Sequence, residues 1–155
     1  MLSQILEFIA NHALLSLAFV LALAAVLFNE YRNLTAGFKA VGPLIATRII
    51  NDEDPLILDV RENSEVKDGI IADALHIPLG ELSRRMAELE PHKDRTVLIY
   101  CRSGSRSASA ARRLRRAGFE KVYNLAGGIM AWADQHLPVV RPGSRKNKGK
   151  NRKKK

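Results

Sequence analysis

The sequence predicts an α/β domain with an open, mostly parallel sheet flanked by helices, preceded by one N-terminal transmembrane helix. Short aliphatic runs without polar alternation recur after Pro43, and charged, helix-like stretches separate them. Buried parallel strands have such continuous apolar runs, and a regular alternation of strands with helices favours parallel pairing. An uncharged apolar stretch near the N-terminus predicts the membrane helix.

The membrane helix is predicted from residues 13–28, which contain no charged side chain. When the apolar residues back to Ile5 are included, the helix reaches the ~20 residues that a bilayer requires. We therefore interpret 1–28 as a transmembrane anchor and 29–42 as a juxtamembrane linker. A cleaved signal peptide would need a positively charged start, which is missing, and a buried core helix is disfavoured because the stretch is apolar on all sides.

The charges around this stretch predict its orientation. Residues 1–12 contain no Lys or Arg, whereas Arg32, Lys39 and Arg48 follow the stretch. The positive-inside bias then places the C-terminal domain in the cytoplasm, with the chain crossing the inner (plasma) membrane once. A reducing compartment also suits a chain with a single cysteine.

The predicted globular domain covers 43–140. Its strands are expected at 56–60, 74–78, 96–100 and 121–125. Its helices are expected at 44–51, 62–67, 79–89, 107–117 and 128–136.

The last segment, 141–155, carries nine of the 25 basic residues and no acidic one, so it is predicted to be a disordered basic tail. Without it the domain has balanced charges, which argues against a nucleic-acid-binding body. Two partners fit the tail itself, an anionic lipid surface and RNA or the ribosome. A solvated tail without a partner is the third possibility.

The only cysteine, Cys101, comes directly after the predicted strand 96–100. Ligands of open parallel sheets bind beyond the carboxyl ends of the strands, which is where this residue is expected. Backbone N–H groups of a Gly-containing turn at a helix start can surround an anion, and such surroundings lower the pKa of a thiol. The candidate residues are Cys101 as the nucleophile and Arg102, Ser103, Gly104, Ser105 and Arg106 as the substrate-binding loop.

The helix predicted after the loop takes Ser105 or Ser107 as its N-cap and Gly118 as its stop. The residues expected to face the sheet are Ala108, Ala111 and Leu114.

Taken alone, a cysteine at the end of a strand is more often a small buried hydrophobe than a nucleophile. The Arg-Ser-Gly-Ser-Arg sequence that follows Cys101 favours the reactive thiol. Only four residues separate Cys101 from Arg106, and a ring this short has too few amides to surround a phosphate. Phosphatase and arsenate reductase chemistry is therefore disfavoured. One cysteine also excludes an internal disulfide and most cysteine-based metal sites, so no metal or cofactor is predicted.

Four motifs resemble the rhodanese family of sulfurtransferases, over about residues 43–139. The segment LILDVRENSEV (56–66) is similar to the family's Asp-x-Arg segment, and DALHIP (73–78) to its Gly-Ala-x-x-Ile-Pro segment. CRSGSRS (101–107) resembles the active loop, and AGFEKVYNLAGGIMAW (117–132) resembles the closing segment.

This resemblance implies that Cys101 accepts a sulfane sulfur from a small anion such as thiosulfate and passes it to a thiol or protein acceptor. It implies that the amides of 102–106 stabilise the thiolate and the persulfide, and that the arginines orient the donor. Asp59 and Arg61 are expected to support the loop and not to move protons. The glycine pair at 127–128 is expected to form a tight turn outside the site.

Two functions from different classes stay open. The first is a membrane-anchored sulfurtransferase of the thiosulfate sulfurtransferase type, and the second is a non-catalytic rhodanese-like module that tethers a partner at the membrane. The complete loop favours the first, because an interaction module needs no thiolate.

Overall fold

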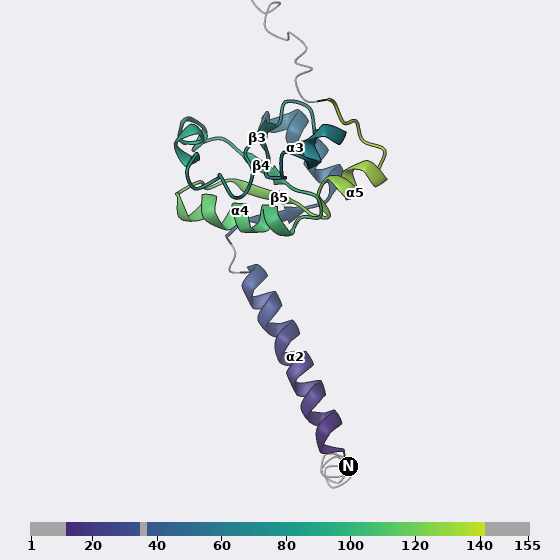
Figure 1. Ribbon diagram of the computed structural model, residues 1–155. Coiled ribbons are helices and arrows are strands. Elements are labelled where there is room, and N and C mark those ends of the chain that lie inside the picture. The colour runs from purple at the N-terminus through teal and green to yellow at the C-terminus, as the bar shows by residue number, and fades with distance from the viewer. Residues whose placement is uncertain (1–11, 35–36, 142–155) are drawn as a thin grey trace, which may run out of the picture. The chain divides into compact units, whose positions relative to one another are not determined.

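The computed structural model describes residues 12–34 and 37–141, and the chain divides into two compact units, Met1–Ala36 and Gly37–Lys155. In the first unit, the helix α2 runs from Ala13 to Leu34 (Figure 1). Its side chains over 13–28 are almost all exposed. The helix therefore extends into the segment predicted as a linker.

The transmembrane anchor predicted over 1–28 is not confirmed. Within the described parts of the chain, no helix is both long enough and apolar enough to cross a membrane. The uncharged run 13–28 is shorter than the ~20 residues that a span needs, and residues 1–11 lie outside the described residues. The basic tail predicted over 141–155 also lies outside them, except for Arg141.

The second unit is built around a five-stranded parallel sheet with the order β1-β5-β4-β2-β3, which confirms the predicted fold class. The neighbouring interior strands β2 and β4 are buried along their whole length, as continuous aliphatic runs predict. The strands are β1 (Lys39–Val41), β2 (Leu56–Asp59), β3 (Leu75–His76), β4 (Val97–Tyr100) and β5 (Val122–Leu125).

Strand β1 corrects the predicted linker 29–42, because it belongs to the sheet. It pairs with β5 in a parallel register that places Lys39 opposite Tyr123. A strand of three residues is too short to produce a pattern in the sequence, which is why it was not predicted.

Three of the five predicted helices are confirmed, and two segments form short 3-10 turns instead. The helices are α3 (Pro43–Glu53), α4 (Ser105–Arg116) and α5 (Gly128–Asp134). The turns within these two segments are η1 (Glu65–Asp68) and η2 (Met86–Glu88), and a third turn, η3 (Glu90–His92), follows the second segment. In the segment predicted as a helix over 79–89, Gly80 near the start and Pro91 beyond the end disfavour a regular α-helix.

Helix α4 differs from its prediction in the residues of its buried face. It ends before Gly118, which has a φ of 91° as expected of a helix stop. Its buried face contains Ala110 together with Ala111 and Leu114, whereas Ala108 is only half-buried.

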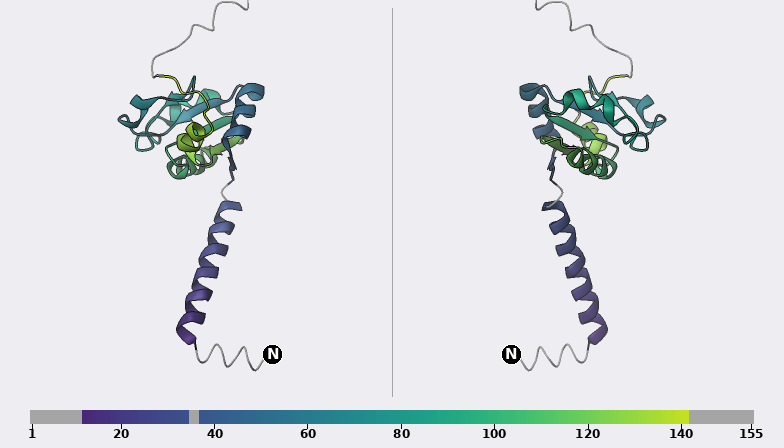
Figure 2. Two further views of the ribbon diagram at one scale, coloured as in Figure 1. Left: turned by 90° about the vertical axis from the view of Figure 1, so that its right-hand side faces the viewer. Right: turned by 90° about the vertical axis from the view of Figure 1, so that its left-hand side faces the viewer.

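Two hydrophobic clusters cover the two faces of the sheet. Alternate strand residues point to opposite faces, with Leu58 and Ile99 in one cluster and Ile57 and Leu98 in the other. Helix α4 packs on the first face, and α3 and α5 pack on the second, so that the sheet is covered on both sides. The course of the chain through these layers can be followed in Figures 1 and 2.

The central position of β4 generates a stability prediction. Ile99 is fully buried, so Ile99→Ala should lower the free energy of unfolding by about 2–5 kcal/mol through the cavity that it leaves. Ile45 is 55% exposed and serves as the matched control, because Ile45→Ala should change that free energy by no more than about 0.5 kcal/mol. Urea denaturation followed by circular dichroism measures both. Equal losses in the two variants would contradict this description of the core.

Candidate active site

Cys101 lies directly after β4, the strand in the middle of the sheet. The loop 101–104 joins this strand to α4, which begins at Ser105. Gly104 is the N-cap of the helix and has a φ of 96°, the left-handed conformation that a residue without Cβ adopts readily. The N-cap predicted at Ser105 or Ser107 is therefore wrong, because the turn into the helix needs a positive φ one residue earlier.

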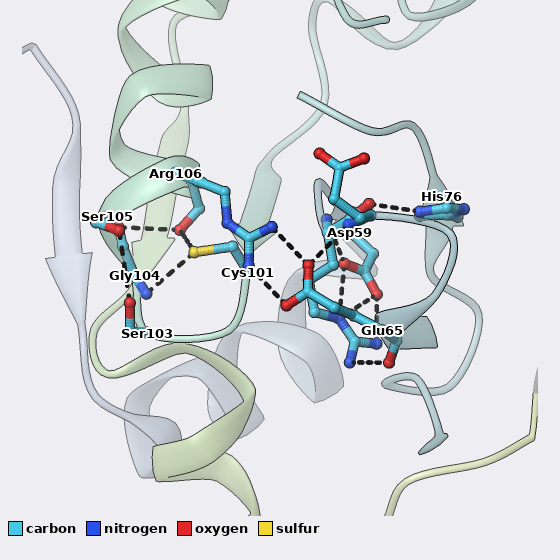
Figure 3. Close-up of polar contacts among 11 residues, drawn as sticks. Asp59, Glu65, His76, Cys101, Ser103, Gly104, Ser105 and Arg106 are labelled. Carbon is cyan, nitrogen blue, oxygen red and sulfur yellow. Dashed lines mark hydrogen bonds and ion pairs between the residues drawn. The ribbon is translucent and has the colours of Figure 1, made fainter. Parts of the chain in front are cut away.

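Hydrogen-bond donors of this loop converge on the Cys101 sulfur (Figure 3). The main-chain N–H of Gly104 donates to Sγ at 3.1 Å, and the hydroxyl of Ser107 donates to it at 3.4 Å. Burial raises the pKa of the thiol, but hydrogen bonds from the Ser107 hydroxyl and from the N–H groups of Ser107, Gly104 and Ser103 outweigh it, so the pKa lies below its ordinary value. Cys101 itself is 0% exposed, so its sulfur is held away from bulk water.

The start of α5, which follows β5, also binds the loop 101–104, through hydrogen bonds to the loop's carbonyl groups. The N–H of Ile129 donates to the carbonyl of Cys101 at 2.9 Å, and the N–H of Met130 donates to that of Arg102 at 3.2 Å. These carbonyls are thereby bonded to the N-terminus of α5 and not directed at the sulfur. Gly128 makes the approach possible, since it has a φ of 59° and a Cβ there would collide with the backbone of Cys101 and Arg102.

A second set of bonds fixes the Gly104 carbonyl. The Asn124 side-chain amide donates to this oxygen at 3.1 Å, and the Ser107 hydroxyl, whose one proton is shared between the Cys101 sulfur and this oxygen, also lies 3.1 Å from it. Asn124 comes from β5 and is 6% exposed. Strand β5 therefore positions the loop through a side chain as well as through the turn that follows it.

Arg106 extends from the start of α4 toward η1, where it meets Glu65 (Figure 3). The two guanidinium nitrogens Nη1 and Nη2 lie 2.6 and 2.7 Å from the two carboxylate oxygens of Glu65. Such a bidentate ion pair has a fixed geometry. Arg106 was predicted to bind the donor, and the structure places it on a carboxylate of this chain.

Asp59 and Arg61 form a buried pair at the end of β2. Arg61 Nη2 lies 2.7 Å from Asp59 Oδ2, and Arg61 also donates to the carbonyls of Glu65 at 2.9 Å and Gly69 at 2.7 Å. Burial lowers the pKa of Arg61, but the bonds and charge of Asp59 outweigh this, so that its pKa is raised and it stays charged. Arg61 thus bonds to Asp59 and to the loop after β2, and its guanidinium lies 5.6 Å from the centre of the Tyr100 ring, so the geometry gives this pair a supporting position.

His76 joins the same network. Its Nε2 lies 2.8 Å from the Arg61 carbonyl and donates to it. The imidazole is therefore engaged with the backbone after β2 and has no bond to the Cys101 sulfur. Among the described residues, no group of three His, Cys, Asp or Glu is arranged to hold a metal ion.

The remaining residues of the predicted loop lie at its outer side. The hydroxyls of Ser103 and Ser105 are 3.5 Å apart and exposed. The Arg102 side chain lines a cleft of about 330 Å³ next to the loop. The other residues that line this cleft are Arg61, Glu65, Asp68, Gly69, Ile129, Met130, Ala133 and Val139.

Comparison of the chain with known protein families identifies the family to which it belongs. The family model described as "Rhodanese-like domain" matches residues 44–135, which is more than half of the chain. The chain belongs to the rhodanese-like domain family.

Relatives of this rhodanese-like domain extend the comparison. The chain is 35% identical over 141 residues to "Uncharacterized protein YibN" of Escherichia coli K12, covering 90% of this chain and 99% of the relative. It is 45% identical over 98 residues to "Sulfurtransferase" of Allochromatium vinosum, covering 63% and 90%. A rhodanese-related protein of Thermoplasma volcanium has a crystal structure that superposes with a TM-score of 0.60 at 32% identity, covering 66% of this chain and 98% of that one.

Four residues of the rhodanese-like site were missed by reasoning from the sequence. Ser107 was considered only as a helix cap, Gly128 only as part of a turn, and Glu65 and Asn124 were not considered. The polar Asn124 within the otherwise apolar run of β5 was the one local signal, because a buried amide on a strand needs a partner. The Glu65–Arg106 pair joins positions 41 residues apart, which no local pattern reveals.

Because Gly128 packs closely against the loop, any side chain at this position should strongly lower the free energy of unfolding. Gly128→Ala should lower the free energy of unfolding by about 3 kcal/mol, because it adds a collision with the backbone to an unfavourable φ. Gly80→Ala is the matched control, since an added Cβ meets nothing within 4 Å, and it should stay within about 1 kcal/mol of the wild type. Thermal unfolding of both variants measures this, and a fully stable Gly128→Ala would refute the contact.

The hydroxyl of Ser107 should control the reactivity of Cys101. Ser107→Ala removes one donor to the sulfur, so alkylation by iodoacetamide at neutral pH should slow by about three- to tenfold as the thiolate fraction falls. Ser109 is the control, because its hydroxyl bonds to the Ser105 carbonyl and not to the sulfur, and Ser109→Ala should leave the rate unchanged. An equal or faster rate in Ser107→Ala would show that this bond does not stabilise the thiolate.

Proposed function

We propose that this chain is a sulfurtransferase that carries sulfane sulfur on Cys101 as a persulfide, taken from a small anionic donor such as thiosulfate and given to a thiophilic acceptor. The observation that carries the proposal is the convergence of N–H and O–H donors on Sγ, which favours the charged form of the sulfur. The name of the Allochromatium vinosum relative supports the same class of reaction.

The first half-reaction begins with attack of the Cys101 thiolate on the sulfane sulfur of the donor. A new S–S bond forms at Cys101, and the electron pair of the old S–S bond leaves with the donor remnant, which is sulfite when the donor is thiosulfate. In the second half-reaction, a lone pair of the acceptor attacks the outer sulfur. The persulfide bond then breaks, and its electron pair returns to Cys101 as the thiolate.

The loop suits both states of this cycle, because the thiolate and the persulfide each carry one negative charge. The donors on Sγ are already oriented before the reaction, and their effect is greater in a site sheltered from water. Neither half-reaction requires a proton at Cys101. The engagement of His76 with the Arg61 carbonyl is compatible with such a cycle, since no imidazole base is needed.

The acceptor is expected to be a thiol or a protein, and we propose that the reaction takes place in a reducing compartment such as the cytoplasm. A free thiol supports this location, because oxidising compartments convert exposed or transiently exposed cysteines to disulfides.

One observation favours the alternative function, a non-catalytic rhodanese-like module that positions a partner. Cys101 is 0% exposed, which is typical of a cysteine that only fills the core. The polar donors around its sulfur argue against this alternative, because an inert core cysteine needs no such surroundings.

A sulfur-transfer assay distinguishes the two functions. The purified chain treated with thiosulfate should hold sulfur that cyanide releases as thiocyanate, and Cys101→Ser should hold none because the persulfide cannot form. Thermal unfolding of Cys101→Ser controls for folding. A folded wild-type chain that takes up no sulfur from thiosulfate or from an organic persulfide would favour the interaction module.

A further inference from the structure

The ion pair between Glu65 and Arg106 brings a carboxylate to the mouth of the Cys101 loop. The pair is bidentate, and the two side chains are 23% and 29% exposed, so that it is neither fully solvated nor part of the core. Glu65 and Arg102 line the same cleft beside the loop. An anion that occupies this cleft beside Arg102 therefore lies near the carboxylate of Glu65, which is paired with Arg106.

Glu65 is held in place independently of Arg106. The N–H of Glu62 donates to Glu65 Oε2 at 3.0 Å, and Arg61 Nη1 donates to the Glu65 carbonyl at 2.9 Å. The bonds and charge of Arg106 lower the pKa of Glu65 to about 2, so the carboxylate is ionised throughout the physiological range. Its position is thus fixed by the loop after β2, and its charge is permanent.

Two of the three arginines in and beside the cleft are paired within the chain. Arg61, which lines the cleft, is paired with Asp59, and Arg106 at the start of α4 is paired with Glu65. In the described part of the chain, Arg102 is the cleft-lining arginine that has no ion-pair partner, and Asp68 adds a further carboxylate to the same cleft. A doubly charged donor is therefore less well matched by this cleft than a singly charged one.

We propose that Glu65 is a specificity-determining residue, which withdraws Arg106 from donor binding and makes the site discriminate against dianionic sulfur donors in favour of monoanionic ones. This inference rests on the proposed function, because it concerns which donors reach Cys101. It assigns the donor class as organic thiosulfonates and persulfides, which have one negative charge beside an apolar group. Ile129 and Met130, which line the cleft, supply an apolar surface for such a group.

Two donors that differ in charge but react in the same way isolate this effect. Thiosulfate carries two negative charges, and methanethiosulfonate carries one, with a methyl group in place of one oxygen. In each case the Cys101 thiolate forms a bond to the terminal sulfur, and the electron pair of the broken S–S bond leaves with sulfite or with methanesulfinate. The ratio of their KM values therefore measures how strongly the site discriminates between a dianionic and a monoanionic donor.

Glu65→Gln tests the proposal, because it removes the charge and nearly keeps the shape. The KM for thiosulfate should fall more than the KM for methanethiosulfonate, and their ratio should fall by about fivefold, since a dianion is repelled twice as strongly as a monoanion. KM values do not depend on the fraction of folded enzyme, so partial unfolding of the variant does not disturb the ratio. Glu88→Gln is the matched control, because Glu88 pairs with Arg85 on a 3-10 turn away from the loop, and it should leave the ratio unchanged.

A binding measurement makes the inference independent of turnover. Sulfate and methanesulfonate are unreactive mimics of the two donors, and their protection of Cys101 against iodoacetamide gives their dissociation constants. The ratio of these constants, sulfate to methanesulfonate, should also fall by about fivefold in Glu65→Gln. Because this arm needs no sulfur transfer, a wild-type chain that forms no persulfide would refute the proposed function and still leave the charge discrimination measurable.

Two results would overturn the inference. Equal changes for dianion and monoanion in Glu65→Gln would show that Glu65 acts only on the structure of the loop. A rise in the thiosulfate KM would show that Glu65 instead holds Arg106 in the orientation in which it binds the donor.

Discussion

The site depends on one constraint, that the backbone after β4 directs N–H groups at the Cys101 sulfur and directs its carbonyls elsewhere. The left-handed turn at Gly104 brings its N–H to 3.1 Å from Sγ. The start of α5 then binds the carbonyls of Cys101 and Arg102, which removes two acceptors that would repel a thiolate. The parallel sheet makes this possible, because β4 and β5 are neighbours and end at the same edge.

Ion pairs connect this loop to the one after β2. Arg61 binds Asp59 and the carbonyls of η1 and Gly69, and Glu65 of η1 binds Arg106 at the start of α4. The two loops are thus joined by charged groups at the edge of the sheet. A buried or half-buried pair of this kind contributes more to geometry than to net stability, because desolvation offsets much of the attraction. The main effect of these pairs is to fix the positions of charged side chains near the Cys101 loop.

The sequence was informative where the pattern was local. The strands β2, β4 and β5, the glycine turn of the active loop and the position of Cys101 were all predicted from neighbouring residues. Strand β1 was missed because its three residues have no readable period, and the segment 79–89 was predicted as a helix because apolar spacing outweighed the effect of Gly80. The Glu65–Arg106 pair and the contact of Gly128 with the loop arise from tertiary folding, so no local rule predicts them.

The central claim is that hydrogen bonds lower the pKa of the buried Cys101 thiol below its ordinary value, and titration of the ultraviolet thiolate absorbance of the folded chain tests it most directly. Because Cys101 is the single cysteine, the signal belongs to one group. The account predicts a midpoint clearly below the ordinary thiol value of about 8.5. A midpoint at or above that value would mean that burial outweighs the hydrogen bonds, and the site would then be a core position without a nucleophile.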